Sequence, residues 1–358
     1  MVKWLLRVLR NLLIFIVVTA VIVLVGLWLL VTKTAYYPED FEEIETSGRS
    51  ETVISPGQSL TLLTWNIGNG ANGSDAEYIL DGGQSVLATT EERVKENTAA
   101  IIEKLKETDP NIILLQQVDF NSTRSYYYDE TKAISDAFEE TESAFALDQK
   151  AHLVPYPWPM IGKIKGGSLT LSRINSLGAE RISLPVTAKK PDNLFTVRPC
   201  MLVTRYPIYG VEQQLVIINV RLMTYDDPTE VRKQMTVLRD FMKTEYEKGN
   251  FVIACGDFHQ SFATEENSFP IVEGRWKAEP FSSDLFEEGW HWGSAGGGIP
   301  TERSLNLPYK EGTREQIQFS LTDGYVTTPN IGVSSAEAID MQFVPSDHNP
   351  ILLRISMQ

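Results

Sequence analysis

Polar side chains follow several apolar segments of this chain, at the point where each segment ends. Sheet proteins commonly build their sites at such positions, because loops that follow strands meet at one edge of a sheet. Each residue alone is equally typical of a turn or a helix cap, so the inference depends on the whole set. The set consists of Asn66 after LTLLTW, Gln117 and Asp119 within IILLQQVD, Asp257 after FVIACG, and Asp347 with His348 before the last apolar run.

The apolar segments themselves predict strands that must position these residues. Sheets covered by helices are the natural architecture, because buried β-rich runs lie beside helical periodicities and outnumber them. The chain is therefore predicted to be an α/β protein. Strands are expected at residues 59–66, 111–119, 167–172, 200–205, 214–220, 251–258, 321–328 and 350–355.

Two helices are predicted from start signals followed by apolar positions at helical spacing. Thr89 and Glu92 form a capping-box signature, and the helix that follows ends at Asp109-Pro110. Asp227, Pro228 and Glu230 supply a second start, followed by an apolar stripe that ends before Gly249. Methionines and aromatic residues on these stripes are assigned to the core.

Residues 1–35 predict a cytoplasmic N-terminus and a transmembrane anchor. Leu12 to Val31 carry no charge and span roughly 30 Å as a helix. Basic residues precede this run and acidic residues follow it, which places the N-terminus in the cytoplasm and the rest outside. The alternatives are a cleaved signal peptide, whose apolar region would be shorter, and a buried core helix. Residues 36–57 are interpreted as an acidic linker, and residues 58–358 as one domain.

The charge of this domain limits its partners. Four of the 32 Lys and Arg residues lie in the first 35 positions, so the remainder carries 28 basic and 47 acidic groups, a formal charge of −19. Strong binding of long nucleic acid is not expected, because phosphate affinity needs clustered Lys and Arg. Cys200 and Cys255 lie in apolar runs and are expected to be buried thiols, not a disulfide.

Six short motifs occur in a fixed order along the chain. They are TWNIG at 64–68, LQQVD at 115–119, INVRL at 218–222, GDFH at 256–259, LTDGY at 321–325 and PSDHNP at 345–350. In these motifs and their order the chain resembles the endonuclease/exonuclease/phosphatase superfamily, which has the DNase I-like fold, from about residue 60 to the C-terminus. The anchor and NSTRSYY at 121–127 are similar to membrane-anchored, externally facing members from Gram-positive bacteria.

This resemblance implies a four-layer α/β sandwich and a divalent-metal phosphoesterase. In the family, Mg²⁺ polarises a phosphoryl oxygen while water attacks in line. Mapped onto this sequence, Asp257 orients the nucleophile, and Asp323 orients His348, which stabilises developing charge. The metal ligands implied are Asn66, Gln117 and Asp347.

Three positions depart from the family pattern. Gln117 stands where the family has a metal-binding Glu, so weakened Mg²⁺ affinity is expected, with Mn²⁺ as an alternative. Arg221 replaces a His and can clamp phosphate but cannot exchange a proton. His259 replaces an Asn. Asp119, two residues after Gln117, lies on the same face of a regular strand and is considered as a replacement charge.

The sequence supports one main functional hypothesis and two alternatives. The first is a membrane-anchored, extracytoplasmic phosphoesterase with His348, Asp257, Asp323, Arg221 and His259 as catalytic residues. Arg124 and Arg198 are candidates for phosphate contact. The substrate is expected to be a phosphorylated small molecule, a lipid head group or a short oligonucleotide. The second hypothesis is a non-catalytic protein of the same fold that binds a phosphate-bearing or protein partner, and the third is an unrelated adhesion domain.

Overall fold

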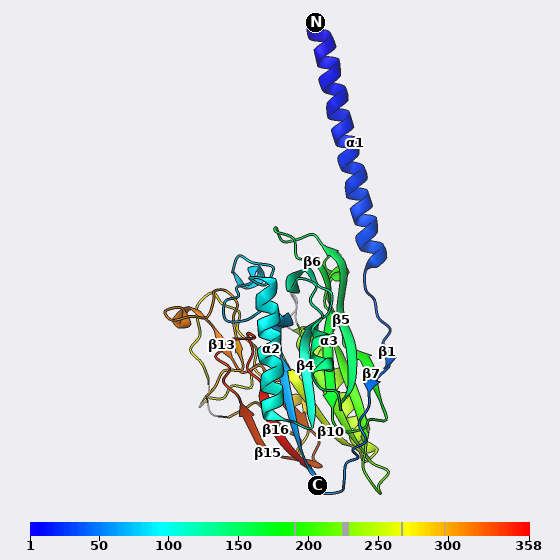
Figure 1. Ribbon diagram of the computed structural model, residues 1–358, viewed down its shortest axis with the longest axis vertical. Coiled ribbons are helices and arrows are strands. Elements are labelled where there is room, and N and C mark those ends of the chain that lie inside the picture. Colours follow the sequence, from blue (N-terminus) through cyan, green and yellow to red (C-terminus); the bar gives the residue numbers. More distant parts are fainter. Residues whose placement is uncertain (190, 224–228, 266–267, 297) are drawn as a thin grey trace.

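The computed structural model describes the chain from residue 1 to 358 apart from 190, 224–228, 266–267 and 297. A long N-terminal helix, α1 (Val2–Thr34), stands away from a domain built of two packed sheets (Figure 1). The apolar side chains of α1 are largely exposed, and the helix is long and apolar enough to cross a membrane.

Within the described part of the chain, each of the two mixed sheets has seven strands. In spatial order the first contains β1 (Phe41–Ile44), β7 (Gly178–Ser183), β8 (Cys200–Pro207), β9 (Gln214–Arg221), β10 (Phe251–Asp257), β14 (Asp323–Thr327) and β11 (His291–Gly293). The second contains β15 (Ile331–Ala338), β16 (Ile351–Met357), β3 (Ser59–Asn66), β4 (Ile112–Asp119), β6 (Gly162–Ser172), β5 (Glu142–Val154) and β2 (Ser47–Gly48). A separate small pair is formed by β12 (Glu302–Arg303) and β13 (Phe319–Ser320).

Helices cover the outer faces of both sheets. On the second sheet lie α2 (Glu91–Thr108) and the short α3 (Glu130–Asp136), and on the first lies α4 (Thr229–Glu247). The order of layers is therefore helix, sheet, sheet, helix. This confirms the predicted α/β class and the four-layer sandwich.

Alternation along the strands divides the core into layers. Leu60 and Leu62 of β3 join the apolar layer between the sheets, whereas Leu63 and Trp65 face α2. Leu238 belongs to the buried stripe of α4 on the other side. Truncating one of these buried leucines to Ala would cost about 2–5 kcal/mol of unfolding free energy, because a cavity is left behind.

The two predicted helices are present, with one correction at a cap. Thr90, not Thr89, is the N-cap of α2, because the Thr90 hydroxyl accepts the Arg93 amide at 3.0 Å while the Thr89 hydroxyl donates to Asp75. The apolar stripe of α4 is buried as predicted. Its predicted cap, Asp227-Pro228, lies outside the described residues.

One feature differs from the interpretation of the sequence, and another agrees with it. Residues 36–57, interpreted as a linker, carry β1 and β2, so this segment pairs with both sheets. Cys200 and Cys255 are buried free thiols, which confirms the prediction.

Candidate functional site

The strand-end residues of both sheets meet at one end of the sandwich. β3 runs parallel to β4, and β9 runs parallel to β10, so the carboxyl ends of these four strands lie together. Across the sheets, the Asn66 amide nitrogen donates to the Asp257 carboxylate at 3.1 Å. Strand-end residues that are far apart in the sequence, such as Asn66 and Asp257, are therefore brought together, while their individual roles remain predictions.

His348 and Asp323 form a buried pair. The Nδ1 atom of His348 lies 2.8 Å from Oδ2 of Asp323, and the second Asp323 oxygen is buried with no hydrogen-bond partner among the described residues. Burial alone would lower the pKa of His348, but the Asp323 carboxylate outweighs it and holds that pKa well above its usual value. Trp65 fixes the backbone here by donating its indole N–H to the His348 carbonyl at 2.8 Å. The pair thus presents an imidazolium at neutral pH.

Asp257 is a buried carboxylate with one hydrogen bond on each oxygen. Oδ1 accepts the backbone amide of His259 at 3.0 Å, and Oδ2 accepts the Asn66 amide. Only 5% of the residue is exposed. These bonds fix its orientation, as is needed in a group that positions a water molecule.

Gln117 lies in a β-bulge of β4. The register shifts between Leu115 and Val118, and Gln117 has a φ of 53°, so regular alternation is lost at this point. In the orientation that satisfies its amide, the nitrogen donates to Oδ1 of Asn66 at 2.9 Å and the oxygen accepts N–H groups of Arg221. Gln117 therefore links the second sheet to Arg221 at the end of β9.

Asp119 does not act as the replacement charge considered from the sequence. Its carboxylate accepts two Arg124 N–H groups, both at 2.8 Å, and the Ser125 hydroxyl at 3.1 Å. The bulge at Gln117 removes the shared strand face on which the idea depended. The same pairing engages Arg124, which was predicted to contact phosphate.

Arg221 is almost enclosed and has an acidic neighbour. Its side chain is 13% exposed, and Nη1 lies 3.9 Å from the Asp148 carboxylate. Burial raises the pKa of Asp148 to about 6, although Arg221 and Arg124 oppose this. At pH 7 a carboxyl with this pKa is still mostly ionised, so Asp148 offsets part of the positive charge of Arg221.

His259 is half-buried and Asp347 is buried. The His259 ring stacks on Trp276 with 4.3 Å between ring centroids, and burial, with further effects from Arg221 and His348, lowers its pKa to about 4. His259 is therefore neutral at pH 7. The Asp347 carboxylate accepts the Asn72 amide at 3.2 Å and the Ser346 hydroxyl at 3.3 Å.

The Arg198 side chain holds the segment after α1, while its backbone amide donates to the Asp148 carbonyl at 2.6 Å. Its Nε donates to the Tyr36 carbonyl at 3.2 Å, its Nη2 donates to the Asn193 carbonyl at 2.5 Å, and the guanidinium lies over the Tyr37 ring at 4.7 Å. These contacts give Arg198 a structural role, and nothing in them brings it to the predicted phosphate position.

Solved structures of one fold resemble this chain over most of its length. An endonuclease/exonuclease/phosphatase from Beutenbergia cavernae DSM 12333 is 15% identical, with a TM-score of 0.56 over 84% of this chain and 72% of that chain. A second, from Bacteroides vulgatus, is 13% identical, with a TM-score of 0.53 over 84% of this chain and 100% of that chain. The human Nocturnin catalytic domain with a bound sulfate anion is 14% identical, with a TM-score of 0.51 over 88% and 98% of the two chains.

This chain has the endonuclease/exonuclease/phosphatase fold. The fold is the one expected from the six motifs. No protein-family model matches the chain, and no curated protein matches it.

Enzymes with the endonuclease/exonuclease/phosphatase fold generally use a divalent metal, but the donor set here does not fit tight binding of a hard cation. Mg²⁺ prefers carboxylate oxygens, whereas the Gln117 oxygen faces the positive Arg221 guanidinium. The Asn66 oxygen already accepts the Gly68 amide at 3.1 Å. Among the described residues, no three His, Cys, Asp or Glu side chains are grouped so that they could hold a metal ion.

Two acidic residues of the site were not found from the sequence. Glu302 pairs with the backbone of His348 and accepts the Thr322 hydroxyl at 2.8 Å, and burial raises its pKa to about 8 despite the opposing effect of His348. Asp148 faces Arg221 from β5. Glu302 does not follow an apolar run, and the short run before Asp148, AFAL at 144–147, was not predicted to be a strand, so the strand-end pattern did not indicate either residue.

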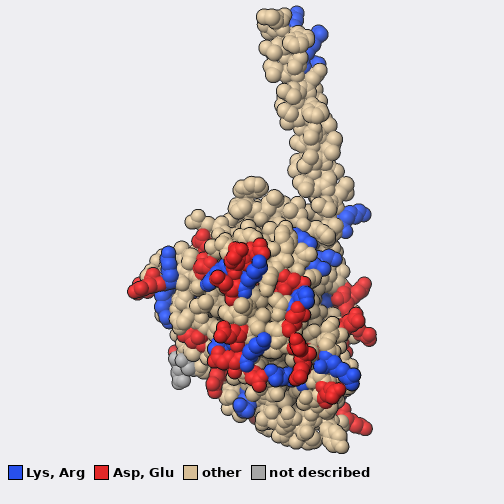
Figure 2. Space-filling model, viewed as in Figure 1, with Lys and Arg blue, Asp and Glu red and all other residues tan. Residues whose placement is uncertain are grey.

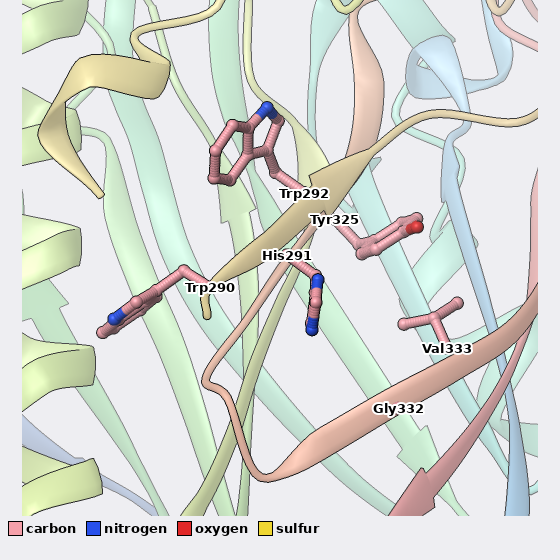
Figure 3. A pocket seen from close by; sticks show the side chains of 6 residues that line it. All are labelled: Trp290, His291, Trp292, Tyr325, Gly332 and Val333. Carbon is pink, nitrogen blue, oxygen red and sulfur yellow. The ribbon is translucent and has the colours of Figure 1, made fainter. Parts of the chain in front are cut away.

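A cavity of about 560 Å³ lies elsewhere, between the edge strands β11 and β15. Figure 3 shows Tyr325 and the side chains of Trp290, His291 and Trp292 around it. None of the strand-end residues lines this cavity, so it is separate from the candidate site.

Proposed function

We propose that this chain is a membrane-anchored phosphoesterase that hydrolyses a phosphodiester or a phosphomonoester. The observation that carries the proposal is the meeting of the Asp323–His348 pair with the Asp257–Asn66 pair at one end of the sandwich. The fold supports it, since two of the similar structures are endonuclease/exonuclease/phosphatase proteins and a third binds sulfate, which resembles phosphate in shape and charge.

The proposed chemistry divides between an oriented base and two cations. Asp257 accepts a hydrogen bond from the attacking water and takes its proton as the oxygen–phosphorus bond forms. Arg221 and the His348 imidazolium bind phosphoryl oxygens and stabilise the charge that develops as the leaving group departs. His259 is neutral and contributes through the backbone amide that orients Asp257.

The metal dependence predicted from the sequence stays a prediction. With Gln117 in place of a carboxylate, we expect Mg²⁺ or Mn²⁺ to bind weakly, with Asn66 and Asp347 as the remaining oxygen donors. The roles assigned to Asp257, Arg221 and His348 require no metal ion besides Mg²⁺ or Mn²⁺.

We propose that α1 spans the cell membrane with the N-terminus in the cytoplasm and the domain on the extracytoplasmic side. Lys3, Arg7 and Arg10 lie near the N-terminal end of α1, residues 11–32 carry no charge, and Lys33 lies in the last turn; Figure 2 shows this uncharged stretch of the helix in tan. The positive-inside rule then sets the orientation.

A non-catalytic function has one observation in its favour. The contact between Gln117 and Arg221 joins the two sheets with amide and guanidinium groups where a metal site would need carboxylates. A protein of this kind would bind a phosphate-bearing partner through Arg221 and His348 without turnover.

The test is hydrolysis by the full chain in detergent or nanodiscs. Bis-p-nitrophenyl phosphate and p-nitrophenyl phosphate would be assayed in EDTA, Mg²⁺ and Mn²⁺. We expect turnover that is lost in Asp257→Asn and retained in Asp136→Asn, a change on the exposed side of α3. Absence of turnover in all conditions, together with phosphate binding by the folded protein, would favour the non-catalytic alternative.

A further inference from the structure

The register of the first sheet places the end of α1 at the same end of the domain as the candidate site. Phe41, the first residue of β1, pairs with Ile182, which pairs with Met201, which pairs with Val220. Val220 precedes Arg221, so β1 begins level with the site and runs away from it. The helix that precedes β1 therefore joins the domain at the site end.

The connection between α1 and β1 is short, and hydrogen bonds fix it to the domain. Residues 35–40 span at most about 20 Å when extended. Tyr36 donates its hydroxyl to the Leu147 carbonyl at 3.2 Å and is contacted by Arg198, and α1 itself contacts β5. The domain is thus kept close to the end of α1.

A hairpin of the second sheet projects beyond the site at this same end. Asp119, at the end of β4, pairs with Gly166, and β6 begins four residues earlier at Gly162. At about 3.3 Å per residue, the hairpin extends roughly 13 Å past the end of β4 before its turn. In Figure 1 the turn of the β5–β6 hairpin lies beside the lower end of α1.

The turn of this hairpin is apolar and exposed. Residues 155–161 read PYPWPMI and contain no charge. Tyr156 is 75% exposed, Trp158 79% and Met160 42%. Lys163 and Lys165 follow directly in β6. Exposed tyrosine and tryptophan with basic residues behind them are typical of segments that enter the membrane interface.

We propose that the hairpin turn 155–161 inserts into the surface of the bilayer that α1 spans, and that the site takes phosphoesters of lipid head groups. This inference rests on the proposed anchoring and phosphoesterase function. The anchor, the hairpin turn and the ends of β3, β4, β9 and β10 all lie at one end of the domain, so the site faces the bilayer. Tyr127, 56% exposed, lies beside the hairpin because its hydroxyl contacts Thr123, which accepts the Lys163 amide.

A label at the hairpin turn tests the contact with lipid directly. Because both native cysteines are buried, Tyr156→Cys can be labelled selectively with an environment-sensitive fluorophore in the full chain in nanodiscs of phosphatidylcholine and phosphatidylglycerol. The matched control is Tyr209→Cys, since Tyr209 is 74% exposed and follows β8 at the opposite end of the sandwich.

We expect the label at position 156 to gain fluorescence several-fold and to be quenched by lipids that carry a quencher, while the label at 209 is unaffected. Equal behaviour of the two labels would overturn the proposal. A shielded label at 156 that lipid quenchers do not reach would overturn it too, because it would indicate a protein partner.

Activity separates lipid substrates from soluble ones. The double variant Tyr156→Ser with Trp158→Ser is expected to lose at least tenfold in hydrolysis of a lipid head-group phosphodiester in vesicles, but to retain hydrolysis of bis-p-nitrophenyl phosphate. Equal loss on both substrates, or no loss on the lipid, would overturn the substrate assignment. If the wild type hydrolyses neither substrate, the phosphoesterase proposal fails, whereas the label experiment still decides the contact with the membrane.

Discussion

The two halves of the candidate site are built on opposite principles. In the acid half, Asp257, Asp323 and His348 form short, buried hydrogen bonds around carboxylates. In the arginine half, Gln117 and Arg221 join the two sheets through amide and guanidinium groups. The acid half keeps carboxylates, whose negative charge orients protons. The arginine half has the positive guanidinium of Arg221 and the neutral amide of Gln117 instead of carboxylates. A site can therefore keep its proton chemistry while losing the donors that a hard metal requires.

The largest expected effect comes from the acid half. In Asp323→Asn the residue can still hydrogen-bond His348, but the charge that stabilises the imidazolium is lost. We expect a decrease in turnover of about 10²–10³-fold, the usual cost of removing one group that stabilises transition-state charge. Steady-state kinetics would measure it, with circular dichroism as the control for folding.

The pH dependence of turnover tests the same pair, because the direction in which it shifts can be predicted. His348 has a raised pKa, so its charged form is present at low pH and is lost as pH rises through the folded-state pKa. In Asp323→Asn this loss should move to lower pH. An unchanged basic limb in the variant would contradict the role assigned to the pair.

The arginine half is expected to control phosphate affinity. Arg221→Met removes a guanidinium that can hold two phosphate oxygens, whereas Arg221→Lys keeps the charge without the paired donors. We expect inorganic phosphate to bind about 10–100-fold more weakly to the Met variant in EDTA, and to an intermediate degree to the Lys variant. Calorimetric titration would measure this, and equal binding by all three proteins would make Arg221 a purely structural link between the sheets.

Converting the arginine half into an acid one should create a metal site. The triple variant Gln117→Glu, Arg221→His and His259→Asn places a carboxylate where an amide now faces a cation. A unit charge pair at 4 Å is worth on the order of 4 kcal/mol at an effective dielectric of 20, before desolvation, so a fraction of it gives about a tenfold gain in Mg²⁺ affinity. The control is Gln213→Glu, an exposed change at the opposite end. No gain over this control would show that the remaining donors cannot complete a metal site.

The sequence predicted the elements whose pattern is local. β3 and β10 follow from apolar runs that end in a polar residue, and the stripe of α4 follows from helical spacing. β5 was not predicted, although it is the longest strand in the described part of the chain, because Glu142, Asp148 and Lys150 interrupt its apolar pattern. Its polar positions are satisfied by distant partners: Ser176 donates its backbone amide and hydroxyl to the Glu142 carboxylate.

The site, like the fold, was predicted only in part from the sequence. Strand-end position indicated Asn66 and Asp257, and the motifs indicated Asp323 and His348. The bulge at Gln117 could not be predicted, because a register shift depends on pairing with β6. Glu302 was missed for the same reason: only its tertiary position beside His348 distinguishes it from a surface acid.

The smallest expected effect concerns His259, where the two halves meet. Its pKa is lowered to about 4, so between the ordinary His value of 6.5 and about 4 the unfolded chain binds a proton that the folded chain does not. The contribution of neutral His259 to stability is therefore present above pH 6.5 and is lost as pH falls toward 4. Because the ring is partly exposed beside Trp276, we expect the lowered pKa of His259 to change the unfolding free energy by only on the order of 1 kcal/mol.

Carboxylates titrate in the same pH range, so the quantity to measure is the difference in unfolding free energy between wild type and His259→Asn, by urea denaturation at pH 7 and pH 4.5. The difference in unfolding free energy should become smaller at the lower pH. A constant difference would mean that His259 is as easy to protonate as a free histidine, and that neither burial nor the charges of Arg221 and His348 lower its pKa.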